Sequence, residues 1–298
     1  MSAQEAVRRF VFDGALVGVG GQTIGRSAMS IYHEIIRQGK KDLFLVGCNL
    51  SLCMDMLVGA GLVRRTECGT GNMERFGTTF AWRRAIEQGK LENEDYSHLA
   101  MATRFLGGEM GLPFMPTQSL LGSDILNRKH STTGKKFELI ANPWNPEEKV
   151  ALLPSLNPDV SIIHAQKADS MGNLIIEGFL AHEPEMIRAS KRVVVSCEEI
   201  VPSEEIRRYP ERTTIAYPYV SAVVLQPWGA HPTGTYRYYS HDAEHIREYQ
   251  KAAREGGAAF QKYLEHYIFS SSCFDEYLEK VGGLKKYNAL RQDMMQLV

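Results

Sequence analysis

Short apolar runs alternate with amphipathic stretches along the first part of the chain. Each apolar run is followed by a polar turn that contains glycine, and then by a segment whose apolar side chains recur at helical spacing. Because strands that are buried on both faces are apolar throughout, this pattern predicts a parallel sheet covered by helices. The predicted strands cover residues 15–19, 43–46 and 62–68, and the predicted helices cover residues 25–38, 51–58 and 80–87.

The same alternation continues through the middle of the chain. The further predicted strands are 149–153, 159–164, 174–176, 192–196 and 221–225, and the further predicted helices are 97–108 and 184–191. From His241 onward the pattern is helical, with one long segment to Tyr267 and two shorter ones, and Ser272 and Asp275 form a predicted capping box. The expected fold is a single α/β domain over residues 1–298, with an open, mostly parallel twisted sheet, helices on both faces and a helical part at about 241–298.

Three polar turns follow the first three predicted strands, at residues 20–22, 47–49 and 69–72. Because the carboxyl ends of parallel strands meet at one edge of the sheet, where ligands bind, these turns are expected to converge. The amides of Gly20 and Gly21 are expected to point into that crevice, where a phosphate, a carboxylate or an acyl-transfer oxyanion could bind. The alternative is that the two glycines only make a tight turn between strand and helix.

The first turn lacks the dinucleotide-binding fingerprint. Gly18 and Gly20 are followed by Gly21, Gln22 and Thr23, so the third glycine of the motif is missing. The acid expected about twenty residues further on could only be Asp42, which precedes the second strand. The spacing therefore argues against a nicotinamide cofactor.

Composition narrows the function classes further. The chain is 44% hydrophobic and 23% charged with a net charge of −1, which fits a globular protein and points to neither nucleic acid nor a membrane surface as partner. No apolar run could span a bilayer, and the first residues lack the apolar core of a signal peptide. The five cysteines are scattered, which fits reduced thiols in the cytoplasm, and the histidines show no metal-ligand spacing. We expect no metal and no permanently bound cofactor.

Several stretches together resemble one family. The stretches are residues 20–22 with Arg26, 55–59, 89–97, 111–116, 163–166 with Asp169 and 172–173, 196–200, 204–208 and 229–232. In order and spacing they are similar to the α (A) subunit of class I CoA-transferases, and most of all to the glutaconate CoA-transferase A subunit, from about residue 6 to about residue 280. The α subunits of steroid ring-opening CoA hydrolases are similar more loosely.

The resemblance implies a heteromeric enzyme. In the family, A and B subunits of similar open α/β fold share an active site at their interface, and we expect an α2β2 assembly with a B subunit. A glutamate attacks an acyl-CoA thioester and becomes a glutamyl-CoA thioester, so that coenzyme A moves between carboxylic acids. That glutamate lies on the B subunit, so this chain is expected to lack the nucleophile and to contribute to binding of acyl-CoA.

The expected contacts to substrate come from the turns. The amides of Gly20 and Gly21 and the side chain of Gln22 are expected to face the acyl group, and Arg26 an anion such as a substrate carboxylate or a CoA phosphate. Asn72 matches an asparagine in the same turn of the glutaconate enzyme. Its neighbours at residues 73–76 depart from that enzyme's small polar residues, which argues against glutaconate itself as the acyl group.

Two further stretches extend the candidate site. Gly122 and Ser123 are also expected to contact substrate. Phe76, Phe80 and Trp82 would suit a larger or aromatic acyl group, although core packing explains them as well.

His98 carries the alternative function. In the ring-opening hydrolases the reactive acid comes from the α chain, and His98 occupies the corresponding position here. It could act as a general base for water or for a carbon acid. The alternative is a residue at a helix start or interface that takes no part in chemistry. A third hypothesis is a non-catalytic acyl-CoA-binding protein.

Other polar residues within the family stretches are expected to be structural. His164 and His231 are expected to tie down turns by hydrogen bonds, and Asp169 to stabilise its own turn. The acids at 198 and 199 are expected to pair with the arginines at 207 and 208.

Overall fold

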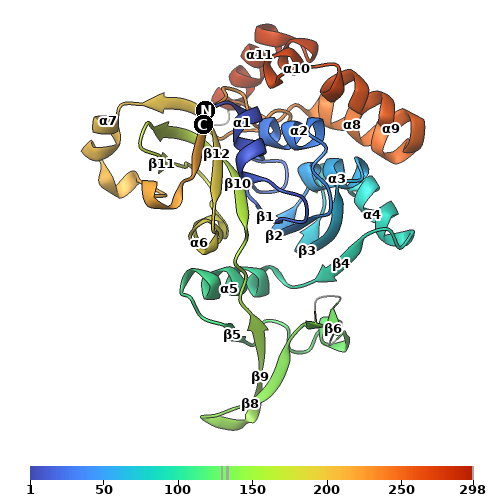
Figure 1. Cartoon of the computed structure of the whole chain (residues 1–298), viewed down its shortest axis with the longest axis vertical. Helices are drawn as coiled ribbons and strands as arrows, with labels where there is room; N and C mark the ends of the chain where they lie inside the picture. Colours follow the sequence, from blue (N-terminus) through green and yellow to red (C-terminus); the bar gives the residue numbers. More distant parts are fainter. Residues whose placement is uncertain (129, 132–133, 297–298) are drawn as a thin grey trace.

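The computed structural model describes residues 1–128, 130–131 and 134–296 of the chain. Its centre is a twisted sheet in which seven strands run parallel, in the order β13-β12-β10-β1-β2-β3-β4, while β11 pairs antiparallel with β10 (Figure 1). This is the predicted open, mostly parallel sheet. The strands are β1 (Leu16–Val19), β2 (Leu43–Leu50), β3 (Val63–Gly71), β4 (Glu92–Asp95), β10 (Val160–Asp169), β11 (Leu174–Ile175), β12 (Val193–Val201) and β13 (Ala222–Leu225).

Helices cover both faces of this sheet, as the alternating pattern predicts. One face packs against α1–α4, and the C-terminal helices α8–α11 share their hydrophobic core; the other face packs against α5 and α6. The helices are α1 (Ala3–Phe10), α2 (Met29–Arg37), α3 (Leu52–Gly59), α4 (Phe80–Glu87), α5 (His98–Glu109), α6 (Glu183–Ala189), α7 (Ser203–Arg208), α8 (Ala243–Glu255), α9 (Gly257–Leu264), α10 (Phe274–Lys280) and α11 (Gly283–Met295). The single domain over residues 1–298 stays a prediction, which the shared core supports.

A small antiparallel sheet projects from the body below α5 (Figure 1). Its order is β5-β9-β8, from β5 (Phe114–Thr117), β8 (Glu138–Asn142) and β9 (Asn145–Pro154), and β9 leads into the central strand β10. A short hairpin, β6 (His130–Ser131) and β7 (Gly134–Lys135), lies between β5 and β8. The sequence pattern predicted only part of β9, because the exposed strand β8 carries no continuous apolar run.

Several predicted boundaries are wrong. The stretches 47–49 and 69–71 are the last residues of β2 and β3 instead of turns, and α2 begins at Met29 instead of at residue 25. The long C-terminal helix is interrupted at Gly256 and Gly257, both at positive φ, and continues into a π-helical turn at Glu265–Phe269.

The predicted capping box is also wrong. Cys273 is the N-cap of α10, and the backbone N–H of Ser272 donates to Glu276 (2.7 Å), while Asp275 accepts a hydrogen bond from Gln226 (2.6 Å). Among the described residues, no helix combines the length and the apolar character needed to cross a membrane.

Candidate active site

The carboxyl ends of β1, β2 and β3 meet the first residues of α5 and α6 at one edge of the sheet. The backbone N–H of Gly21 donates to Glu183 (2.9 Å), and that of Cys48 donates to Nε2 of His182 (3.3 Å). The Cys48 thiol donates to the carbonyl of His98 (3.4 Å). Segments far apart in the sequence are therefore joined here by direct hydrogen bonds, as the convergence of the strand ends predicts.

The amides of the turn after β1 all have partners inside the chain. The N–H of Gly20 donates to Ile162 O (2.9 Å), that of Gly21 to Glu183 Oε1 (2.9 Å) and that of Gln22 to Gly25 O (2.8 Å). The sequence-based expectation of free amide donors is therefore wrong in this structure, because a carboxylate of the protein itself takes the place predicted for an external anion.

Glycine is required in this turn for steric reasons. A Cβ on Gly20 would lie 2.6 Å from Glu183 Oε1 and 2.5 Å from Cγ2 of Ile163, and Gly21 has φ +84°. Only a residue without a side chain lets Glu183 approach the backbone this closely. The geometry supports the alternative interpretation, in which the two glycines shape a tight turn.

Arg26 is buried, with 5% of its surface exposed. Its Nη1 donates to His164 O (2.7 Å) and to Glu183 Oε1 (3.2 Å), and its Nη2 donates to Glu183 Oε2. The anion that explains Arg26 is therefore Glu183, and not a substrate carboxylate or phosphate. Arg26 lies two residues before Ala28, the N-cap of α2, and is therefore not part of the helix.

A pocket of about 360 Å³ opens beside this turn. Gln22 and Arg26 line it together with Glu74, Phe179, Tyr236 and His241, among others. The side-chain Oε1 of Gln22 is buried and has no hydrogen-bond partner within the described residues. An unpaired buried amide oxygen costs free energy until a donor reaches it, so this atom is suited to contact a ligand.

Asn72 helps to build one wall of this pocket. Its side-chain oxygen accepts a hydrogen bond from the backbone N–H of Glu74 (2.9 Å), and the Glu74 carboxylate accepts one from Thr23. Asn72 therefore fixes the loop after β3 against the turn after β1. Burial and the adjacent Arg75 lower the pKa of His241 at the rim, which favours a neutral imidazole at pH 7.

A second group of polar residues lies at the start of α5. Ser97 is the N-cap of this helix, and its hydroxyl accepts a hydrogen bond from Ala100 N–H (3.0 Å), which leaves His98 as the first helical residue. The exposed His98 ring lies with Nε2 3.0 Å from the hydroxyl of Thr70. A Cβ on Gly69 would be 2.2 Å from Cδ2 of this ring, so the glycine makes room for the imidazole.

The hydrogen bonds assign the tautomer of His98. Thr70 donates its single hydroxyl proton to Oδ1 of Asn49, so its oxygen is left to accept a proton from Nε2 of His98. In the neutral imidazole, Nδ1 is then the nitrogen with the free lone pair. The arrangement orients a base, as an Asn–Thr–His relay, at the open edge of the sheet.

Gly122 and Ser123 are not among the described residues that line the pocket beside Gln22. Both are exposed, and the Ser123 hydroxyl donates to Leu120 O (2.7 Å). The hydroxyls of Ser119 and Ser97 are hydrogen-bonded, which holds this loop against the start of α5. The predicted site residues thus form two groups, one around Gln22 and one around His98.

The aromatic residues after β3 pack mainly in the core. The indole N–H of Trp82 donates to Thr66 (3.0 Å), and Phe76, Phe80 and Trp82 all pack against the main hydrophobic cluster. Phe76 also contacts His241, with ring centroids 5.7 Å apart. Core packing accounts for Phe80 and Trp82, and only Phe76 reaches a residue that lines the pocket.

The remaining family residues form buried hydrogen-bond networks. His164 contacts Ser196 (2.8 Å) and Glu198 (2.7 Å), and His231 contacts Tyr277 (2.7 Å). Asp169 accepts hydrogen bonds from three backbone amides of its own turn, as predicted. The predicted pairing of Glu198 with an arginine is wrong, because its carboxylate instead accepts from Trp228 N–H (2.7 Å).

Sequence reasoning missed Asn49, Thr70, His182 and Glu183. His182 is buried and stacks on Phe105 with ring centroids 5.2 Å apart, and burial lowers its pKa to about 4. No sequence motif includes these residues. Only the unexplained positive charge of Arg26 indicated that an acid such as Glu183 had to lie nearby. Within the described residues, no group of three histidine, cysteine, aspartate or glutamate side chains could hold a metal ion.

Several known proteins are similar to this chain in sequence and fold. A family model described as coenzyme A transferase matches residues 1–226. The A subunit of the glutaconate CoA-transferase of Acidaminococcus fermentans is 34% identical over 97% of this chain and 93% of its own length. The A subunit of the 3-oxoadipate CoA-transferase of Pseudomonas knackmussii is 35% identical over 95% of this chain and 98% of its own length. The matches to these two A subunits extend over nearly the whole chain.

The solved structure of the Acidaminococcus fermentans glutaconate CoA-transferase superposes with a TM-score of 0.92 at 33% identity, covering 97% of this chain and 94% of that one. An uncharacterized protein of Archaeoglobus fulgidus is 40% identical over 98% of this chain, which spans 64% of that protein's length. A cholesterol ring-cleaving hydrolase subunit of Rhodococcus jostii is 25% identical over 89% of each chain.

Proposed function

The chain belongs to the coenzyme A transferase family, and on that premise we propose that it is the A subunit of a heteromeric CoA-transferase. The observation that carries the proposal is the similarity over nearly the full length to two proteins named as A subunits of such enzymes. The polar groups at the carboxyl edge of the sheet, beside a pocket that Gln22 lines, are the second support.

The proposed reaction needs a partner. On the B subunit, the carboxylate of a glutamate attacks the thioester carbonyl carbon and expels CoA thiolate, which gives a mixed anhydride. The thiolate then attacks the glutamyl carbonyl, releases the first acid as a carboxylate and leaves a glutamyl-CoA thioester. A second carboxylate reverses both steps and departs as the new acyl-CoA. This chain contributes Gln22 to the wall of the acyl pocket, and Asn72 fixes the loop whose Glu74 lines the same pocket.

Exposed apolar side chains on α5 and just after it support a heteromer. Leu99, next to His98 on α5, is 63% exposed, Met110 at the C-cap of α5 is 60% exposed, and Phe114 on β5 is 50% exposed. Apolar side chains that gather on one surface mark protein interfaces. We place the B subunit there, where it would close the open side of the site, in an α2β2 assembly of the cytoplasm; the free cysteines agree with a reducing compartment.

The experiment is covalent trapping on the co-expressed A and B subunits. The complex is incubated with an acyl-CoA, treated with borohydride or hydroxylamine, and digested for mass spectrometry. A modified glutamate on the B subunit is the expected result. Turnover of the acyl-CoA without an adduct on either chain would contradict transferase chemistry.

A CoA-dependent hydrolase is the second candidate, and the geometry of His98 favours it. The contacts of Thr70 and Asn49 leave Nδ1 of His98 free to take a proton from water or from a carbon acid. In this case His98→Gln abolishes turnover and no glutamyl adduct forms. His266→Gln, a change at another exposed histidine, is the matched control. The third candidate, a non-catalytic acyl-CoA-binding protein, predicts binding without turnover even with the B subunit present.

A further inference from the structure

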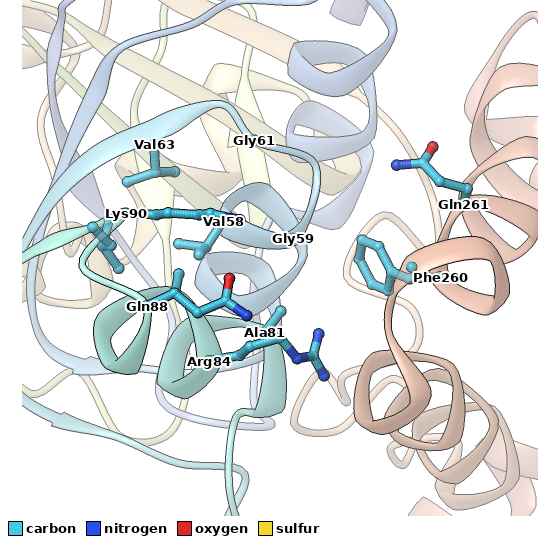
Figure 2. Close-up of a pocket in the computed structure, with 13 residues that line it drawn as sticks. Val58, Gly59, Gly61, Val63, Ala81, Arg84, Gln88, Lys90, Phe260 and Gln261 are labelled. Carbon is cyan, nitrogen blue, oxygen red and sulfur yellow. The ribbon is translucent and has the colours of Figure 1, made fainter.

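A second pocket, of about 490 Å³, lies at the opposite edge of the sheet from the candidate active site (Figure 2). It is lined by Gly61 and Lys90, which precede β3 and β4, whereas Asn72 and His98 follow the same two strands. Its remaining walls come from α3, α4 and α9. The two pockets are therefore separated by the length of these strands.

The lining of this pocket combines two cationic side chains with apolar ones. Arg84 and Lys90 are its charged residues, and no aspartate or glutamate is among the described residues that line it. Val58, Val63 and Phe260 are buried beneath it. Figure 2 shows the Arg84 side chain extending from α4 towards the C-terminal helices that carry Phe260.

The Arg84 guanidinium is held in place without a carboxylate. Its Nη2 donates to the carbonyls of Ala253 and Arg254 at the end of α8, the latter at 3.0 Å. In the part of the chain that the structure describes, no ion pair involves Arg84 or Lys90, whereas the neighbouring Arg83 pairs with Glu87 (2.8 Å). Carbonyl dipoles orient the guanidinium, and its charge partly offsets the rise that burial causes in the pKa of Asp55, but no ion pair among the described residues neutralises it.

We infer that this pocket binds a small organic anion, a carboxylate or a phosphate ester attached to an apolar group. The anionic end lies between Arg84 and Lys90, and the apolar group packs against Val58 and Phe260. The volume is in the range of small-molecule sites, and a charge-assisted hydrogen bond to a fixed guanidinium gives both affinity and orientation. The inference does not depend on the proposed transferase activity.

The pocket is connected to the active-site loop by α4 and α8. Helix α4 directly follows the loop that contains Asn72 and Glu74, and Gln250 of α8 donates to the carbonyl of Phe76 in that loop (2.6 Å). An anion bound between α4 and α9 therefore stabilises the packing of the C-terminal helices against the loop that borders the acyl pocket. This connection makes the site suitable for an effector.

The test uses benzoate and phenyl phosphate as probes on the complete A–B complex, with benzyl alcohol as the uncharged control at equal ionic strength. Calorimetric titration is expected to give saturable binding of both anions and none of the alcohol. Arg84→Met and Lys90→Met should each weaken binding about tenfold, the effect of losing one charge-assisted contact. Ala85→Phe, which fills the pocket, should abolish binding, and Arg83→Met on the same helix should not change it.

Three results would overturn the inference: no saturable binding to the unchanged complex, binding that survives Ala85→Phe, or equal losses from Arg83→Met and Arg84→Met. Circular dichroism checks that each variant is folded. If Arg84→Met unfolds because the end of α8 loses its partner, Lys90→Met and Ala85→Phe decide the outcome.

Discussion

The turn after β1 and the start of α5 lie at the same edge of the sheet, and they use their polar groups in opposite ways. In the turn, Gly21, Arg26 and Glu183 satisfy one another and are buried. At the start of α5, Asn49 and Thr70 support an exposed His98 from one side and leave its other ring nitrogen free. The backbone amides of this turn and Arg26 resemble an anion site in sequence but are paired within the protein, and in this turn Gln22 presents an unpaired oxygen to the adjacent pocket.

The difference follows from the energetic cost of burial. A buried guanidinium needs a carboxylate and further hydrogen bonds, so Arg26 and Glu183 are fixed together as part of the fold. An exposed imidazole has no such requirement, so its hydrogen bonds can be arranged for orientation. A motif rich in glycine and arginine therefore marks structure here, and chemistry is expected at a less conspicuous residue. Three variants test this distinction, and a fourth tests the cost of burying a titratable group.

Arg26→Met should produce the largest change in stability. It leaves Glu183 buried and without its main partner, which costs about 3–5 kcal/mol in the free energy of unfolding. Urea denaturation followed by circular dichroism measures it. The double variant Arg26→Met/Glu183→Met should recover part of the loss, and Arg237→Met, at the exposed pair with Glu177, should cost under about 1 kcal/mol. A loss equally small for Arg26→Met would contradict a structural role.

His98→Gln should lower the reaction rate strongly and leave the stability nearly unchanged. If His98 is the general base, the rate falls about 10²–10⁴-fold, while the free energy of unfolding stays within about 0.5 kcal/mol because the side chain is exposed. Steady-state turnover of acyl-CoA by the A–B complex is the measurement. An unchanged rate would assign His98 to the interface alone and would leave the partner's glutamate as the reactive group.

Gly69→Ala should lower both the stability and the turnover rate, each by an intermediate amount. The added methyl would lie 2.2 Å from Cδ2 of His98 and 2.9 Å from Cys48 O, so the imidazole must move, at a cost of about 1–3 kcal/mol. A matched change in the closed turn is Gly25→Ala, where the nearest atom is 3.2 Å away. Turnover should fall only for Gly69→Ala. If both variants keep full activity, the position of the ring is not important.

At neutral pH His33→Leu should produce the smallest effect on titration-linked stability, because the effect appears only in acid. His33 is fully buried with neither ring nitrogen bonded within the described residues, and burial lowers its pKa well below the usual value. Because the unfolded chain binds the proton more readily, stability is complete above the unfolded pKa near 6.5 and falls as the pH decreases.

The variant should reduce the slope of stability against pH below about pH 6.5 by up to about 1.4 kcal/mol per unit. Burial raises the pKa of Asp55 to about 6, so this carboxyl changes the stability with pH in the opposite direction. It is present in both the unchanged protein and the variant, so it does not contribute to the difference between them. Urea titrations between pH 4 and about 7 measure the slope. Identical slopes for the two proteins would mean that His33 is not the group that is titrated.

The order of the central elements could be predicted from the sequence, because buried parallel strands require uninterrupted apolar runs. Residues 159–164 gave the position of β10, and residues 192–196 that of β12. The ends of β2 and β3 were missed for a physical reason. Gly47 and Gly69 occur there to allow close packing within a strand, with Leu50 and His98 next to them, and not to turn the chain.

The candidate site was harder to predict. Gln22, Asn72 and His98 were found through the family resemblance, and the structure places them at the expected edge of the sheet. The acceptor for Arg26 lies 157 residues further along the chain, so no local pattern could identify Glu183. The same holds for Thr70, which becomes significant only because β3 ends beside α5.

The position of β1 in the sheet also has a consequence for synthesis of the protein on the ribosome. Its neighbours are β2 and β10, and Val17 pairs with Val160 (Figure 1). While the chain grows, the edge of β1 stays unpaired until more than half of the protein has been made, and an unpaired apolar edge is a target for aggregation. The nascent chain therefore depends on rapid arrival of β10, or on a chaperone that covers this edge until then.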